Sequence, residues 1–490
     1  MRGRDEEQRG GLRARLARGG VVNAAFMAGA EGLVVLQGLL ATALLGPRAI
    51  GLYGIVSTTA MTIVALRRVG TDEAFVRHEA HDEGAEFQRA FTVELALGLV
   101  AALLIALAAP VLAALYDDDE LLALTLAVAY LPIAFALQAP QWIFFRRMDY
   151  VRLRVLQAIV PLGTVLVATP LLLAGVGVWA LVIGPFAGNA MAVLAAVRVS
   201  PYPLRLRPDR AAARRYLRFS WPIFLTALGT LVVAQGQIAL FGLDRGLAAA
   251  GWMTLAVTLT RYADRADQIV ATTIYPAIVR VRDRLDAQEE LFASASRIGL
   301  LFALPFGAGL ALFAGDLVAF VLGDEWQPAV ALVAGLALIT AAGQVGYTWF
   351  AFQRARGEPG PQAVETGVLA GTFLALAVPG ALAAGTAGFL AGRAAGMVCV
   401  LAVRRAYVRR LLPGVRIEAL AVRAAVPAAA ASAAVLAVRL ALWGGERPLG
   451  QAVAELALWA GLLAPLVWRL DGALLRELRG LLREPAAERA

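Results

Sequence analysis

Four polar or ionisable residues lie together inside an apolar part of the chain. Arg261, Asp264, Arg265 and Gln268 are spaced i, i+3, i+4 and i+7, and this spacing places residues on one face of an α-helix. The arginine guanidinium is a planar fork of donors that binds phosphate oxygens in pairs. The pattern therefore favours a site for a phosphate or diphosphate group. The alternative is that the helix ends near Thr260, which would leave these residues as a solvated face with internal ion pairs.

Arginine and glutamate also occur inside other apolar stretches, where an ionisable side chain costs roughly 2.5–3.5 kcal/mol and normally faces a protein interior or a water-filled cavity. Arg393 and Glu31 lie near the middle of such stretches. Arg67 and Arg68 occupy the place in the first half of the chain that corresponds to Arg261 in the second. We predict that Arg67, Arg68 and Arg393 join Arg261 and Arg265 as phosphate ligands, with Glu31 as a counter-ion or proton-coupling site.

Glutamines in apolar stretches offer neutral hydrogen bonds that suit sugar hydroxyls. We assign Gln235 and Gln237, together with Asp264 and Gln268, to the polar lining of the same cavity. Further glutamines of this kind are Gln138, Gln141 and Gln344. Such amides could equally hydrogen-bond a neighbouring helix, and the sequence leaves both roles open. Glu94 and Glu365 begin their apolar stretches, from which they could reach the cytoplasmic headgroups.

The composition places these residues in a membrane protein. The chain has 490 residues, is 60% hydrophobic and has a mean hydropathy of +0.70, so it cannot cover itself with polar side chains as a soluble protein must. Its net charge of +9 would suggest nucleic acid in a soluble protein. Here the arginines flank apolar stretches and meet anionic headgroups instead, so we expect membrane lipids as partners and no nucleic acid.

About fourteen apolar stretches are long enough to cross the bilayer as helices. They cover residues 21–45, 51–66, 90–115, 121–145, 155–174, 178–197, 219–242, 248–271, 298–322, 328–352, 364–384, 388–403, 419–443 and 452–468. All 45 basic residues are arginine, and Arg48, Arg245 and Arg447 are the three that fall in the odd-numbered loops. The positive-inside rule then predicts that both termini face the cytoplasm. We expect a protein of the bacterial inner membrane.

Patterns that could signal an enzyme have simpler explanations in this topology. The acidic run 117–120 lies outside the cell, away from nucleotide sugars, and is typical of a solvated turn. His78 and His81 have a metal-like spacing but sit in a polar cytoplasmic loop. The single cysteine, Cys399, lies inside an apolar stretch, where a thiolate would be poorly solvated. We predict no metal site, no cofactor and no enzymatic activity.

The two halves of the chain repeat each other at an offset of about 200 residues. Asn189 pairs with Arg393, Arg198 with Arg404, Gly46 with Gly242, and Gly51 with Gly251. Because each half has an even number of spans, both enter the membrane from the same side, which gives a parallel repeat about the membrane normal. We predict an N-terminal lobe at 1–198, a connecting loop at 199–217, a C-terminal lobe at 218–404, and two further helices with a tail at 405–490.

Four segments carry a resemblance to a known family. They are 44–54 (LLGPRAIGLYG), 175–182 (GVGVWALV), 219–224 (FSWPIF) and 275–280 (YPAIVR). In their order and placement the chain resembles the polysaccharide-transport family of lipid-linked oligosaccharide flippases, in the superfamily that also holds multidrug-and-toxin extruders and the lipid II flippase. The resemblance implies two lobes of six helices and alternating access that moves an undecaprenyl-diphosphate-linked glycan outward, for cell-surface polysaccharide biosynthesis.

Two other functions stay open. A cation-coupled multidrug antiporter shares the fold but would favour acidic and aromatic residues over arginine in its cavity. A membrane-embedded glycan polymerase would need a large extracytoplasmic loop, and every predicted outside loop is short. We expect the protein to act as a monomer, with association with polysaccharide-assembly proteins as an alternative.

Overall fold

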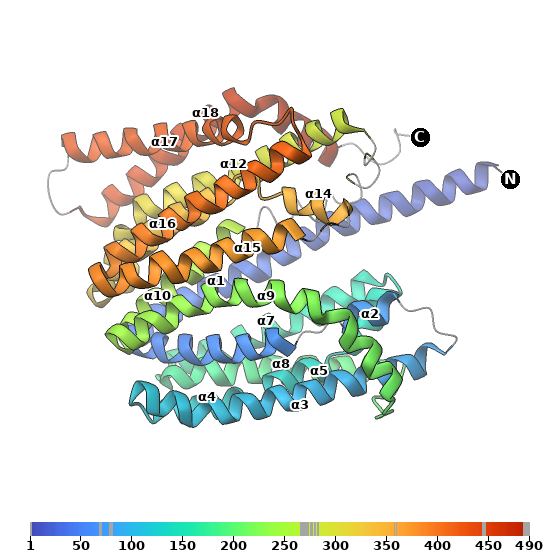
Figure 1. Ribbon diagram of the computed structural model, residues 1–490. Helices are drawn as coiled ribbons and strands as arrows, with labels where there is room; N and C mark the ends of the chain where they lie inside the picture. The colour runs from blue at the N-terminus through green and yellow to red at the C-terminus, as the bar shows by residue number, and fades with distance from the viewer. Residues whose placement is uncertain are drawn as a thin grey trace. The chain divides into compact units, whose positions relative to one another are not determined.

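The structure, a computed structural model, describes residues 2–67, 71–77, 82–264, 274, 278, 281, 284–356, 358, 360–442 and 447–483. The regular elements of these residues are all helical (Figure 1). Nine helices in the described ranges are long and apolar enough to cross a membrane. The prediction of an all-α, multi-pass membrane protein is therefore confirmed, while the count of about fourteen spans stays a prediction.

The chain divides into two compact units. The first comprises Met1–Leu228, Arg245–Gly251 and Gly480–Ala490, and the second comprises Gly229–Asp244 and Trp252–Arg479. The division falls inside α9 (Arg210–Arg245), inside α10 (Leu247–Thr260) and inside α18 (Leu449–Arg483), so each of these helices contributes to both units.

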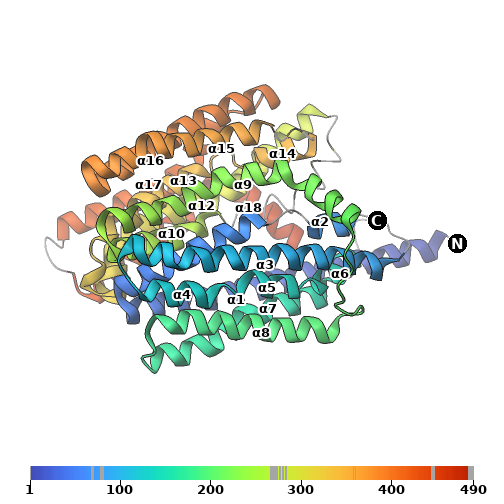
Figure 2. The ribbon, with the colours of Figure 1, turned by 60° about the horizontal axis from the view of Figure 1, so that its bottom comes forward.

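The first unit is a bundle of antiparallel helices. Before α9 its elements are α1 (Arg2–Arg67), α2 (Thr71–Arg77), α3 (Glu83–Tyr116), α4 (Glu120–Val128), α5 (Leu131–Leu137), α6 (Pro140–Arg146), α7 (Tyr150–Leu173), η1 (Gly177–Trp179) and α8 (Ala180–Val199). Asp82 caps α3, because its Oδ1 accepts the Ala85 backbone N–H at 3.0 Å. α3 packs on α4 and α5, and α7 packs on α8 along its length (Figure 2).

Glycines with positive φ turn the chain at two helical hairpins. The 66 residues of α1 would extend about 100 Å as one straight helix, far more than one bilayer crossing needs. Gly46 (φ 71°) interrupts it before Pro47, so α1 contains two successive segments. Gly246 (φ 83°) turns the chain between α9 and α10. The turn residue that matches Gly46 is therefore Gly246, and the match with Gly242 was wrong because Gly242 lies inside α9.

Gly51 and Gly251 make a reciprocal contact within the first unit. A Cβ on Gly51 would lie 1.8 Å from the carbonyl oxygen of Leu247, and a Cβ on Gly251 would lie 1.9 Å from that of Pro47. Only glycine permits so close an approach of two backbones. A reciprocal contact is the pattern that two-fold symmetry produces. It agrees with the sequence repeat, whose axis along the membrane normal stays a prediction.

The second unit contains the remaining helices. They are the 3₁₀ turn η2 (Arg261–Asp264), α12 (Leu285–Leu317), the π-helical turn η3 (Val318–Leu322), the 3₁₀ turn η4 (Asp324–Trp326), α13 (Ala329–Gly343), α14 (Trp349–Arg356), α15 (Gly360–Thr372), the π-helical turn η5 (Phe373–Ala377), α16 (Val378–Leu411), α17 (Ile417–Leu442) and α18 (Leu449–Arg483). α12 packs on α13 and on α17, and α15 packs on α16.

A second long helical run also folds back on itself. The run Gly360–Leu411 has 52 residues, too many for one crossing. Gly385 (φ 65°) breaks it inside α16. A Cβ on Gly388 would lie 2.0 Å from the Gly380 carbonyl oxygen, and one on Gly392 would lie 2.4 Å from that of Leu376. Glycines spaced i, i+4 thus let the two arms of this hairpin, hereafter the 360–411 hairpin, pack backbone to backbone.

Candidate functional site

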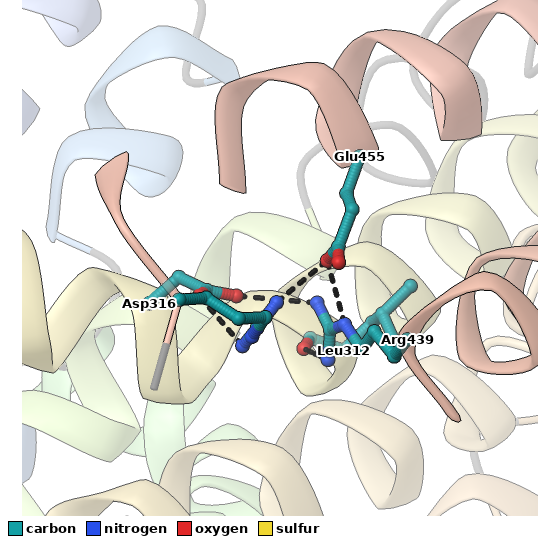
Figure 3. A network of polar contacts seen from close by, with 5 residues as sticks. Leu312, Asp316, Arg439 and Glu455 are labelled. Atoms are coloured by element: carbon teal, nitrogen blue, oxygen red, sulfur yellow. Dashed lines mark hydrogen bonds and ion pairs between the residues drawn. The ribbon is translucent and has the colours of Figure 1, made fainter. Parts of the chain in front are cut away.

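Four charged side chains in the second unit form a closed ion-pair ring. Its members are Asp316 on α12, Arg439 on α17, Glu455 on α18 and Arg447, which lies just before α18; Figure 3 labels the first three. Arg439 Nε lies 2.6 Å from Glu455 Oε2, and its Nη2 lies 3.2 Å from Asp316 Oδ2. Arg447 binds the same two carboxylates at 2.6 and 2.8 Å. The two positive and two negative charges balance, so the ring joins α17 and α18 to α12.

A buried ion pair, Arg404 with Glu365, stabilises a break in the helix of the tenth apolar stretch. The break covers residues 344–348, between α13 and α14, and leaves carbonyls of α13 without helical partners. Arg404 Nη1 donates to the carbonyls of Gly343 and Val345 at 2.5 and 2.7 Å. Its Nε and Nη2 donate to the two oxygens of Glu365 at 3.1 and 2.6 Å. Both side chains are 5% exposed or less, so Arg404 acts as a buried cap whose charge Glu365 neutralises.

Arg393 differs from these paired arginines. It lies in the second arm of the 360–411 hairpin, directly after Gly392, whose backbone packs on Leu376. The Arg393 side chain is half-buried, and its Nε is buried without a hydrogen-bond partner among the described residues. A buried donor without a partner loses its hydration and gains nothing in return. A cation with a free donor inside a membrane span is suited to bind an anion.

Gln237 lies on a helix that packs against the 360–411 hairpin. Phe241 on α9 meets Phe389 on α16 edge to face, with ring centroids 5.1 Å apart. The backbone at Gly236 approaches the ring of Phe373, to which a Cβ would lie 3.1 Å. Gln237 is buried, and its Oε1 has no hydrogen-bond partner among the described residues. A free amide acceptor and a free guanidinium donor therefore occur on two helices that pack together. Gln235, on the same helix, is half-buried.

The arginine face predicted on the eighth apolar stretch does not continue the α-helix. α10 ends at Thr260, and Arg261 to Asp264 form a 3₁₀ turn in which the Arg261 side chain is exposed. Extending the helix through 271 was wrong for residues 261–264, and the alternative of a helix end near Thr260 describes them better. Whether Arg261 binds a substrate stays a prediction, as does the role of Asp264, whose backbone alone is described.

Several predicted residues fall outside what the structure describes. Arg68, Arg265 and Gln268 lie outside the described residues, as do His78 and His81. Arg67 and Glu31 lie in α1, where the structure describes the backbone at these positions. The acidic run 117–120 is a turn beginning at Asp117 (φ 51°), and Arg48 forms ion pairs with Asp118 and Glu120 there.

Sequence reasoning missed the pairing of Arg404 with Glu365 and the ion-pair ring. Glu365 was expected to reach the headgroups, whereas it is buried against Arg404. Arg439 and Glu455 lie inside apolar helices but were not singled out. A usable signal was present, because Arg404 and Glu365 stand at the same end of two successive antiparallel spans. Opposite charges at matching depth in adjacent helices are candidates for pairing.

Comparison with known proteins places the fold. The profile of the family described as "Polysaccharide biosynthesis protein" matches residues 40–331. Among solved structures, the lipid II flippase MurJ in an inward closed conformation is similar over 93% of this chain and 100% of its own, with a TM-score of 0.69 and 10% identity. No curated protein matches the sequence.

Two transporters of the MOP superfamily are also similar in fold. An inward-facing multidrug resistance MATE family transporter matches over 79% of this chain and 96% of its own, with a TM-score of 0.62 and 16% identity. A MOP superfamily transporter from Pyrococcus furiosus, described as having a binding pocket of reverse polarity, matches over 81% and 98%, with a TM-score of 0.56 and 16% identity. The fold of this chain is therefore that of a MOP-superfamily transporter.

Proposed function

This chain belongs to the polysaccharide biosynthesis protein family, and from that premise we propose that it flips an undecaprenyl-diphosphate-linked oligosaccharide from the cytoplasmic to the outer leaflet by alternating access. The fold is that of a MOP-superfamily transporter, and one protein of similar fold is a lipid II flippase. A glycan headgroup cannot cross hydrocarbon unaided, so the transporter must replace its hydration with protein hydrogen bonds and must pair the diphosphate charge.

The observation that carries the proposal is the free guanidinium of Arg393. Arg404 is buried and Arg439 is half-buried, and both are engaged with carboxylates that neutralise their charge. Arg393 has a buried Nε without a partner and no ion pair among the described residues. The free carbonyl oxygen of Gln237, on a packed helix, would accept a hydrogen bond from a sugar hydroxyl. Together they fit an anionic headgroup that carries hydroxyls.

The test is transport of a defined polyprenyl-diphosphate glycan into proteoliposomes. Arg393→Gln removes the charge while keeping hydrogen-bonding capacity. We expect it to lose one charge-assisted contact, about 1.5–3 kcal/mol, or roughly ten- to a hundredfold in headgroup affinity. Arg393→Lys keeps the charge without the planar fork, so its headgroup affinity should lie between those of the wild type and Arg393→Gln. Charge-neutral changes at the exposed Arg205 and Arg207 are controls and should leave transport intact.

Normal transport by correctly inserted Arg393→Gln would overturn this assignment. Arg261 and Arg265 stay in the proposal as further diphosphate ligands, together with Arg67 and Arg68. Arg261→Gln combined with Arg265→Gln tests the first two in the same assay. Intact transport in that variant would remove both from the site.

A cation-coupled multidrug antiporter is the second candidate, because a MATE family transporter has a similar fold. The free group in the span is cationic, which disfavours a cationic drug by like-charge repulsion. Uptake of a lipophilic cation, undiminished in Arg393→Gln, would favour the antiporter. We expect no such uptake, and we expect no glycan polymerisation.

The proposed direction of transport depends on orientation. From the placement of arginine we propose that the protein spans a bacterial inner membrane with both termini in the cytoplasm. The loops at 116–120 and 323–327 then lie outside. An alkaline phosphatase fusion should be active after Asp118 and inactive after Arg147 and Arg284. The opposite pattern of activity would reverse the membrane orientation.

A further inference from the structure

The break between α13 and α14 directs backbone oxygens to one point in the second unit. Inside the break, the carbonyls of Gln344 and Gly346 accept backbone N–H groups three residues further on, each at 3.1 Å. The alternate carbonyls, those of Gly343 and Val345, accept from Arg404 instead. The C-terminal end of a helix also carries a partial negative charge. Two carbonyl oxygens and the negative end of α13 therefore face the same guanidinium.

The carboxylate of Glu365 completes a set of four oxygens. Its two oxygens accept from Nε and Nη2 of Arg404 at 3.1 and 2.6 Å. The rings of Tyr347 and Phe350 add to the site, because their centroids lie 5.6 and 5.9 Å from the Arg404 Cζ and aromatic faces attract cations. Transporters hold Na⁺ with unwound backbone carbonyls and helix C-terminal ends. The four oxygens are therefore of the kind that binds such an ion.

The charge balance of this set selects a monovalent cation. Glu365 is the carboxylate that Arg404 binds, and both side chains are 5% exposed or less. One positive charge neutralises one buried carboxylate, whereas a divalent ion would leave a surplus charge in the protein interior. The guanidinium of Arg404 supplies this single charge, and its hydrogen bonds reach all four oxygens.

We propose that the carbonyls of Gly343 and Val345 and the carboxylate of Glu365 form a monovalent-cation site in which the Arg404 guanidinium takes the place of a bound ion. A guanidinium that belongs to the chain cannot dissociate, so the break keeps its cation in any salt. An ion gradient therefore cannot act through this site in the wild type. Removal of the Arg404 side chain should leave four oxygens that bind a free cation. This role concerns the break alone and holds whatever substrate the protein transports.

The test is the melting temperature of full-length Arg404→Ala in detergent, measured in choline, sodium and guanidinium chloride at equal ionic strength. The salts are used at millimolar concentration, at which guanidinium does not denature, and choline is too large for the site and gives the baseline. A ligand that binds the folded protein alone stabilises it. We expect sodium and guanidinium each to raise the melting temperature of Arg404→Ala by about 2–4 °C. The wild type should show no such rise, because its own guanidinium fills the site.

The matched control is Arg404→Ala combined with Glu365→Gln, which lacks the carboxylate and should respond to neither cation. If Arg404→Ala does not fold in choline, the yield of folded protein purified in each salt replaces the melting temperature, and the same order is expected.

Equal values for Arg404→Ala in all three salts would overturn the cation site. Stabilisation by guanidinium without any by sodium would overturn the exchange of the side chain for an ion. A sodium-dependent rise in the wild type that Glu365→Gln abolishes would show that the native break binds an ion, and would also overturn the assignment. None of these measurements depends on glycan transport, so the transport proposal is tested separately.

Discussion

The α7–α8 hairpin of the first unit and the 360–411 hairpin of the second share a close contact between two helix backbones. They differ in the residue that follows the glycine at that contact. In each, a glycine lets two helix backbones touch: a Cβ on Gly188 would lie 2.5 Å from the Val160 carbonyl oxygen, and one on Gly392 would lie 2.4 Å from that of Leu376. The residue that follows the glycine differs. It is Asn189 in the first hairpin and Arg393 in the second.

The two following residues have opposite surroundings. Asn189 is buried, accepts from Gln138 Nε2 at 3.0 Å, and donates to the Pro185 carbonyl at 2.8 Å. Its partner Gln138 stands at the break between α5 and α6, so a neutral amide pair holds that break. In the second unit Arg404 and Glu365 hold the corresponding break, and Arg393 keeps a free Nε. Where another pair performs the structural task, the matched Arg393 keeps a donor without a partner among the described residues, as the proposed ligand role requires.

The largest loss of stability should come from changing the Arg404–Glu365 pair, which holds the break between α13 and α14. Arg404→Gln leaves Glu365 as an uncompensated buried charge, so we expect a loss of about 3–5 kcal/mol and a strongly lowered melting temperature in detergent. The double variant Arg404→Leu with Glu365→Leu removes both charges and should recover part of that loss. Equal melting temperatures for Arg404→Gln and the wild type would mean that the pair does not hold the break.

A smaller loss of stability is expected from changing Gly188 or Gly392, and the loss should be similar for the two glycines. Gly188→Val and Gly392→Val each push a side chain into a facing backbone, which costs up to about 3 kcal/mol. The melting temperatures of both variants should fall by similar amounts if the hairpins are built alike. Gly367→Ala serves as the control, because a Cβ there meets nothing within 4 Å. A loss at one glycine without the other would separate the two hairpins.

The residues after the glycines should respond in opposite ways. Asn189→Leu leaves the Nε2 donor of the half-buried Gln138 without its acceptor, and we expect a loss of about 1–2 kcal/mol with transport per folded molecule retained. Arg393→Leu removes an unsatisfied group, so its melting temperature should stay the same or rise while glycan transport falls. A destabilised Arg393→Leu would show that this arginine is structural, and the comparison would then lose its functional meaning.

The smallest loss of stability is expected at Gly346, in the turn between α13 and α14. Gly346 has φ 68°, a conformation that costs an L-residue about 1 kcal/mol, and a Cβ there would meet Ile417 at an ordinary 3.4 Å. Gly346→Ala should therefore lower the melting temperature slightly. The α5–α6 break has no glycine at Gln138 or Ala139, so Ala139→Gly should not raise the melting temperature. A gain there would indicate strain in the neutral break.

Much of the fold follows from local properties of the chain. Stretches of apolar residues predict membrane helices because a helix satisfies its own backbone hydrogen bonds, and that requirement acts on each stretch separately. The sequence also matched Gly51 with Gly251, and these two glycines make reciprocal contacts, while the layout of the whole repeat stays a prediction. Helix ends were less predictable: α10 stops at Thr260 although apolar sequence resumes at Ile269.

Residue types and spacings identified arginine, glutamate and glutamine as the groups able to act inside the membrane, because their cost in hydrocarbon depends on the side chain alone. Which of them are free depends on partners far away in sequence. Arg404 meets Glu365 across 39 residues and Arg439 meets Asp316 across 123, and these contacts exist only when the helices pack. Packing also places Gly392 against Leu376 and leaves the Nε of Arg393 without a partner. Composition thus decides that charges lie in the membrane, whereas packing decides which charge can bind a ligand, since pairing requires atoms within a few ångströms of each other.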